Sequence, residues 1–110
     1  MKYFETKFLK EADEFVSRLD KKAIAKLLYN IDLAEKNHGP RLFKKLRDDI
    51  CEFRVRFSSV QIRLLAFWDK TDNKQTFVIE THGFLKKVDK VPLDEIERAK
   101  KIRIDYFENK

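Results

Sequence analysis

The sequence has very few of the residues that interrupt regular structure. Its 110 residues include only two glycines and two prolines, the types that most often mark turns and loops. We therefore expect little loop and a chain that is mostly helix and strand. A length of 110 residues suits one domain with its own hydrophobic core, so a single domain over 1–110 is expected.

Cysteine, metal ligands and long apolar runs are scarce as well. Cys51 is the single cysteine, which excludes an internal disulfide and is typical of the reducing cytoplasm. One cysteine and two distant histidines do not supply the three or four ligands that zinc needs, so no metal or other cofactor is expected. No apolar run reaches the roughly 18–20 residues that cross a bilayer, and MKYFETKFLK has no apolar signal core.

Charged residues are abundant, and their signs are unevenly distributed. They make up 40% of the chain, with a formal net charge of +6. Residues 1–35 hold seven basic and seven acidic side chains, whereas residues 36–110 hold 18 basic and 12 acidic ones. The second part of the chain therefore carries the whole excess. Such a basic region favours nucleic acid, an acidic protein or a membrane surface as partner.

Hydrophobic periodicity divides the chain into an ordered set of elements. They are a strand over 2–8, an antiparallel hairpin of two helices over about 9–19 and 20–37, a charged link over 41–49, strands over about 50–57, 61–69 and 76–84, and a helix that Pro92 opens. The short turns between the last three strands predict an antiparallel meander. The predicted fold class is α+β, with the N-terminal strand and helical hairpin packed on the meander and a helix at the C-terminus.

The strand over 50–57 carries arginine on one of its two faces. Side chains alternate across a strand, so Phe53, Val55 and Phe57 should face the helices. Arg54 and Arg56 should then point away from the helices.

The next strand adds Arg63 to this face in an otherwise apolar sequence. Its neighbours there are Leu65 and Phe67, as expected of a central strand that is covered on both sides. Three converging guanidiniums, offset only by Glu52 and Glu80, repel one another by on the order of 1 kcal/mol per pair. Alternation alone leaves two interpretations open, a solvated sheet face and a site for a polyanion.

His82 is a further candidate, because a pKa near 6.5 suits proton transfer at neutral pH. If alternation continues to the end of its strand, it shares a face with Val78, Glu80 and Phe84. The sequence does not decide whether that face is the basic one.

Four segments carry a resemblance to a known family: KKLRDDICEFRVRF (44–57), IRLLAF (62–67), HGFLKK (82–87) and PLDEIERA (92–99). With the order of elements, they resemble the RelE/HigB superfamily of toxins from type II toxin–antitoxin modules, and most closely its phage-derived HigB-like branch. The similarity spans nearly the whole chain.

The resemblance implies a metal-independent mRNA endonuclease that acts on the ribosome and uses the 2′-OH of the RNA. It also implies a cognate antitoxin, typically a helix-turn-helix protein like HigA, through which the complex would bind operator DNA. A cytoplasmic location and no membrane partner go with this function. Two other classes remain open, a ParE-like inhibitor of DNA gyrase and a non-catalytic basic module that binds nucleic acid.

The candidate catalytic residues are Arg54, Arg56, Arg63, Lys86, Lys87 and His82. By resemblance, Arg63 contacts the scissile phosphate. A guanidinium binds phosphate well, but its pKa above about 12 makes it a poor base, so proton transfer is assigned to the lysines or His82. Well-known relatives have a tyrosine early in the last helix. Here Tyr106 comes too late, and we expect it to pack.

Overall fold

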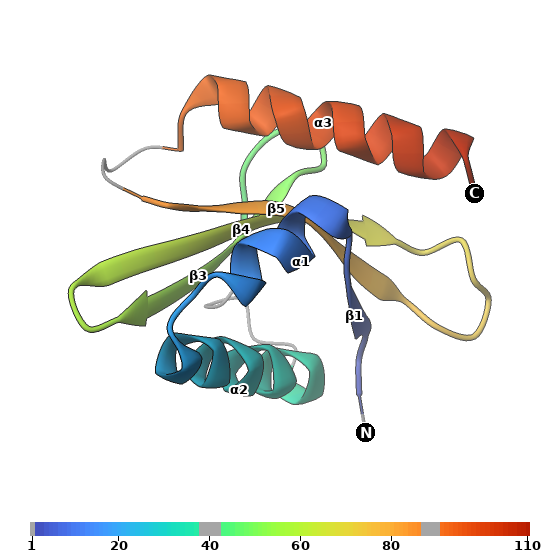
Figure 1. The fold of residues 1–110 in the computed structure, drawn as a ribbon. Helices are drawn as coiled ribbons and strands as arrows, with labels where there is room; N and C mark the ends of the chain where they lie inside the picture. Colours follow the sequence, from blue (N-terminus) through green and yellow to red (C-terminus); the bar gives the residue numbers. More distant parts are fainter. Residues whose placement is uncertain (1, 38–42, 87–90) are drawn as a thin grey trace.

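A computed structural model describes residues 2–37, 43–86 and 91–110. Its elements are β1 (Glu5–Phe8), α1 (Lys10–Ser17), α2 (Lys21–Asn37), β2 (Phe43–Lys45), β3 (Cys51–Phe57), β4 (Val60–Asp69), β5 (Phe77–Leu85) and α3 (Leu93–Glu108). Figure 1 shows α3 on one face of the sheet and α2 on the other. The α+β class and the order of the predicted elements are confirmed. No helix in the described residues has the length and apolar character to cross a membrane.

The strands form one sheet in the order β1-β5-β4-β3-β2. The predicted antiparallel meander is its centre, because β3 pairs with β4 and β4 with β5. The sheet is mixed, since β1 lies parallel to β5 with Glu5 opposite Phe77. The charged segment 41–49, predicted as a link, contains the edge strand β2. Phe43 anchors this strand, with its ring centroid 4.9 Å from that of Phe53.

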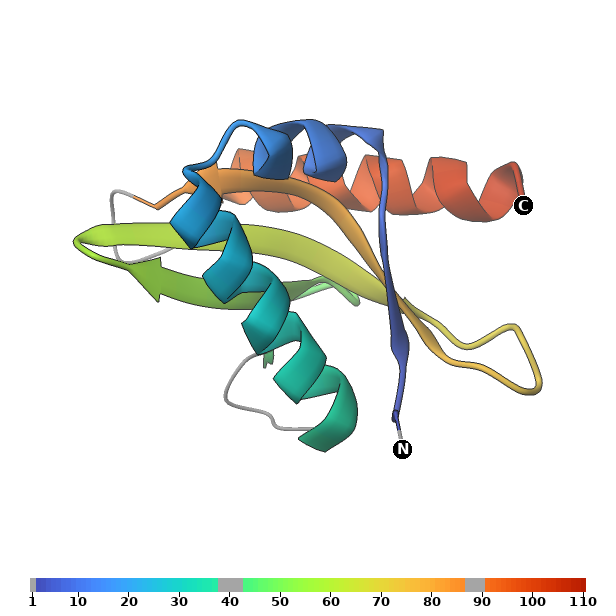
Figure 2. The same cartoon turned by 60° about the horizontal axis from the view of Figure 1, so that its bottom comes forward.

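The two N-terminal helices cover one face of the sheet. Asp20 caps α2 as its residue type predicts, since its Oδ1 accepts a hydrogen bond from the Lys22 amide at 2.9 Å. The pair is bent open rather than closed into a side-by-side hairpin, so that α1 lies over β5 and α2 over β3 (Figure 2). Each helix therefore covers a different part of the sheet.

The core has two parts, one on each face of the sheet. Phe53 and Val55 of β3 belong to the part under α1 and α2, as alternation predicts, together with Leu27 of α2. On the other face, Leu65 and Phe67 of β4 pack under α3. The central strand is thus covered on both sides, as its apolar sequence indicates.

A β-bulge interrupts the alternation of β5. Leu65 pairs with His82, but the next residue, Ala66, pairs with Glu80, so Thr81 is the extra residue. The extra residue shifts the alternation, so the side chains beyond it lie on the face opposite to the one that strict alternation predicts. Glu80 therefore points into the core under α1 and α2, whereas His82 lies on the face of Leu65.

Candidate functional site

The three arginines lie on one face of the sheet, as predicted. Arg54 is directly opposite Arg63 in the pairing of β3 with β4, and Arg56 is opposite Gln61. Their exposure differs greatly. Arg56 is exposed and the Arg54 side chain is 41% exposed, but Arg63 is only 6% exposed.

Glu52 lies between two of the guanidiniums and compensates their charge. Its Oε1 is 3.2 Å from Nε of Arg54, and its Oε2 is 3.2 Å from Nε of Arg63. The carboxylate side chain is 1% exposed, and an ion of either sign is stable at such a depth only when paired. The repulsion expected between the arginines is therefore largely relieved within the protein. Glu80, the other acid considered, is on the opposite face and takes no part.

The guanidinium of Arg63 contacts neighbouring groups inside the protein. Its Nη2 donates to Oε1 of Gln61 at 2.7 Å and its Nη1 to the carbonyl oxygen of Ile62 at 3.2 Å. Burial lowers the pKa of Arg63, and the nearby Glu52 carboxylate opposes that shift. This geometry suits a residue that fixes Glu52 rather than one that meets a ligand first.

His82 is on the arginine face but buried beneath α3. Its side chain is 2% exposed, with Nε2 3.1 Å from Oε1 of Glu95 at the start of α3. Its Nδ1 is 3.0 Å from Oγ1 of Thr81. Burial lowers the pKa of His82, helped by the positive charge of Arg98 and opposed by Glu95. The contact with Glu95 ties α3 to β5 and separates His82 from solvent.

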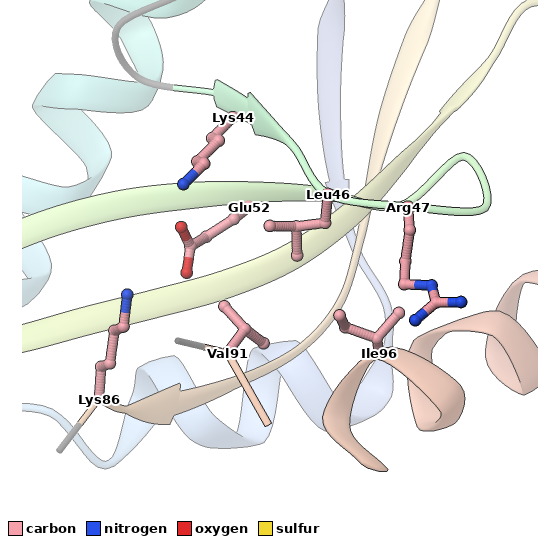
Figure 3. A pocket seen from close by; sticks show the side chains of 7 residues that line it. All are labelled: Lys44, Leu46, Arg47, Glu52, Lys86, Val91 and Ile96. Carbon is pink, nitrogen blue, oxygen red and sulfur yellow. The ribbon is translucent and has the colours of Figure 1, made fainter. Parts of the chain in front are cut away.

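An open pocket of about 270 Å³ lies beside this arginine face. Figure 3 shows its lining, which comes from β2, the β2–β3 connection, β3, the residue after β5, the segment just before α3 and the first turn of α3. The lining residues are Lys44, Arg47, Lys86, Glu52, Leu46, Val91 and Ile96. Three cations, one carboxylate and an apolar wall therefore meet there.

The structure brings some of the predicted residues together and separates others. Lys86 lines the pocket, and Arg54 adjoins it through Glu52. Arg56 lies farther along β3 toward the turn to β4, and His82 is enclosed under α3. Lys87 lies outside the described residues.

Sequence reasoning missed the pocket residues that precede β3. Lys44 and Arg47 belong to the run interpreted as a solvated link, yet they line the pocket. The turn between β2 and β3 places Asp48 and Asp49 at φ 52° and 68°, a left-handed conformation that aspartate tolerates better than most residues. The Asp-Asp pair was therefore a detectable indication of a tight turn.

Tyr106 and Asp69 form a structural contact far from the pocket. The phenol donates a hydrogen bond to Asp69 Oδ2 at 2.6 Å, and its ring packs 5.3 Å from that of Phe67. Burial raises the pKa of Tyr106 to about 12, together with the neighbouring carboxylate. The interpretation of Tyr106 as a packing residue is confirmed.

Comparison with models of protein families identifies the family of the chain. The model of the phage-derived Gp49-like proteins matches residues 14–103. The chain belongs to this family. The match runs from α1 into α3, so it includes the pocket and every candidate site residue of this Gp49-like chain. No curated protein matches the chain significantly.

Proposed function

We propose that this Gp49-like chain is the toxin of a type II toxin–antitoxin module and a member of the RelE/HigB superfamily. It cleaves mRNA on the ribosome in the cytoplasm, without a metal, by using the 2′-OH of the RNA as nucleophile. The observation that supports this most is the cationic face itself. Arg54 adjoins a pocket that adds three further cations, and Arg56 lies farther along the same strand, an arrangement suited to a phosphate backbone.

Each cation has a distinct role in this proposal. Arg54, which is half-exposed and in contact with Glu52 of the pocket, clamps the phosphate as charge builds on it. Arg56 and Lys86 bind neighbouring phosphates. Arg63 is a positioning residue, because it is buried and acts on Arg54 through Glu52. Its Nη1 and Nη2 already donate to groups inside the protein.

Proton transfer falls to Lys86, Lys87 or His82. Lys86 lines the pocket, where its amine can reach a bound RNA. His82 could act only if α3 moved away from β5, since Glu95 covers it. Lys86 is therefore the first candidate for the base.

A cognate antitoxin, a helix-turn-helix protein like HigA, neutralises the toxin in this proposal. The complex binds operator DNA through the antitoxin. Co-expression of such a partner restores growth and protects the mRNA.

The test is induced expression without antitoxin of the wild type, Arg54→Ala and Arg18→Ala. Arg18 is exposed at the end of α1 and is the matched control. Growth and the 5′ ends of cellular mRNA are measured. The wild type and Arg18→Ala should arrest growth and produce codon-phased cuts. Arg54→Ala should lose on the order of a hundredfold of the cleavage, the lower end of the loss for one transition-state contact.

Arg63→Ala belongs in the same experiment with a folding control. Breaking a buried ion pair costs about 3–5 kcal/mol, whereas the half-exposed Arg54 contributes less. Urea unfolding should show a large loss of stability for Arg63→Ala and a small one for Arg54→Ala. An Arg54→Ala protein that still arrests growth without mRNA cuts would contradict the proposal. DNA damage signalling in its place would favour a gyrase inhibitor.

A further inference from the structure

We propose that the single-stranded RNA continues from the pocket around the edge of β3 and binds along one side of α2. The surface that holds it there, which we call the edge strip, consists of Arg56, Lys22, Lys26 and Tyr29. This inference deepens the proposed function and rests on it for the choice of RNA as ligand. It extends the site from the arginine face to the helix that covers the opposite face of the sheet.

Three exposed side chains form a row along α2. Lys22, Lys26 and Tyr29 are spaced i, i+4 and i+7, which places them on one side of the helix. Both lysines are exposed, and Tyr29 is 63% exposed. The side of α2 that packs on the sheet is a different one, and its buried residues include Leu27 and Ile31. The row is therefore accessible to a ligand.

Lys26 joins this row to the strand that carries the arginines. α2 lies over β3 (Figure 2), and Nζ of Lys26 donates a hydrogen bond to the backbone carbonyl oxygen of Arg56. β2 pairs with β3 only as far as Phe53, so the rest of β3 has no described strand on its outer side. The side chain of Arg56 lies on the arginine face. The cations therefore continue from one face of the sheet, around the edge of β3, to the other.

The charges of the edge strip are not compensated within the described part of the chain. No described carboxylate forms an ion pair with Arg56, Lys22 or Lys26, whereas Lys36 near the end of α2 is paired with Asp32 at 3.0 Å. Neighbouring like charges repel one another, and a phosphate backbone that binds across them relieves this repulsion. The strip therefore attracts a polyanion, and it ends before Lys36.

The exposed ring of Tyr29 favours a single strand over a duplex. Surfaces for single-stranded RNA combine cations that follow the backbone with aromatic rings on which bases stack. Bases inside a duplex are stacked on one another, so their faces do not reach such a ring. A single strand is also flexible enough to turn around the edge of β3, with phosphates at the cations and one base on Tyr29.

The experiment measures binding of RNA that the protein cannot cleave. Fluorescently labelled 2′-O-methyl uridine strands of three and twelve nucleotides are titrated with protein at several salt concentrations, and anisotropy gives the affinities. The short strand is held by the pocket, whereas the long one also reaches α2. Lys22→Ala/Lys26→Ala should reduce the magnitude of the salt slope for the long strand by about 1.4, since each phosphate contact contributes about 0.7. The binding of the short strand should stay unchanged.

The matched control removes two exposed cations elsewhere. Lys74→Ala/Lys101→Ala changes the β4–β5 turn and α3 and lowers the net charge by the same amount. It should keep the wild-type slope for both strands, because neither lysine belongs to the edge strip.

Two substitutions of Tyr29 test the stacking. Tyr29→Ala should weaken binding of the long strand on the order of tenfold, within the range for the loss of one stacked base. Tyr29→Phe keeps the aromatic ring and should retain the wild-type affinity. Equal losses for Tyr29→Phe and Tyr29→Ala would contradict a stacked base.

The outcomes separate this inference from the proposed function. Equal salt slopes for the wild type and Lys22→Ala/Lys26→Ala, or an equal loss for short and long strands, overturn the edge strip even if mRNA is cleaved on induction. Unchanged RNA binding with a loss of neutralisation by the antitoxin overturns it too, and assigns the surface to a protein. A loss confined to the long strand, without any cleavage in cells, supports the edge strip and overturns the assignment as a nuclease.

Discussion

Glu80 is a carboxylic acid in the core between the sheet and the N-terminal helices. It is 0% exposed, and neither of its oxygens has a hydrogen-bond partner among the described residues. Burial raises its pKa to about 8, because an ion at this depth loses its hydration without gaining a partner. The side chain is therefore mainly protonated at neutral pH.

The raised pKa of Glu80 makes the stability of the protein depend on pH. A carboxyl group that binds its proton more tightly in the folded state stabilises the fold fully below the unfolded pKa of about 4.5. This contribution is lost as the pH rises through about 8. The free energy of unfolding of the wild type should decline between about pH 4.5 and 8 because of Glu80, and that of Glu80→Gln should not. At pH 9 the variant should be more stable than the wild type.

Chemical denaturation across this pH range measures the effect. Glu14→Gln is the matched control, since Glu14 is exposed on α1, and it should retain the wild-type pH profile. An unchanged profile for Glu80→Gln would mean that Glu80 is ionised in the folded protein.

The chemistry of single residues was only partly readable from the sequence. Alternation placed Arg54 and Arg63 on one face, which the pairing confirms. It could not show that Arg63 is buried, because its burial depends on how the side chains around it, such as Glu52 and Gln61, fold against it. Nor could it show that Glu52 bridges both arginines, since that depends on side-chain rotamers across two strands.

At the scale of elements, β5 is the strand on which α1 is packed most closely. Gly83 of β5 pairs with Leu64, so a side chain at this position would point to the face of the sheet that α1 covers. A Cβ atom there would overlap the ring of Phe15 and lie 2.8 Å from Cδ2 of Leu64. Only a residue without a side chain allows the helix to approach so near.

Gly83→Ala should therefore destabilise the protein by about 1–3 kcal/mol, the usual cost of overpacking a core. Thermal unfolding measures the loss. A second substitution, Phe15→Leu, makes room at the same position, so it should cost less in the Gly83→Ala background than in the wild type. Strictly additive effects of the two substitutions would contradict the contact.

The elements themselves were predicted better than their connections. The periodicities of α1, α2, β3 and β4 are local properties of the sequence and were recognised. The bulge at Thr81 was not, because one extra residue leaves no local mark, and the face of His82 depends on it. The parallel pairing of β1 with β5 and the three-residue strand β2 also depend on distant partners.

At the scale of the whole molecule, three cations from separate segments of the second part of the chain line one pocket. Lys44, Arg47 and Lys86 come from segments on both sides of the central strands. Binding of a polyanion to such a surface releases counterions and weakens as salt is added.

The affinity for a 2′-O-methylated RNA, which the proposed nuclease cannot cleave, should therefore fall steeply with salt. For single strands, each phosphate contact contributes about −0.7 to the slope of log K against log salt concentration. Lys44→Ala should reduce the magnitude of the slope by about that amount. Lys36→Ala is the control, since Lys36 is on α2 and paired with Asp32 at 3.0 Å. Equal slopes for both variants would place the RNA elsewhere.

The pairing of β1 with β5 has a kinetic consequence. Glu5 is opposite Phe77, so the sheet joins segments about 72 positions apart in the chain. Contacts between such distant segments form slowly, because a long loop must close before they contribute. On the ribosome that makes it, the nascent chain therefore cannot complete its sheet until β5 has emerged. The face that carries the arginines is therefore completed only late in the synthesis of the chain.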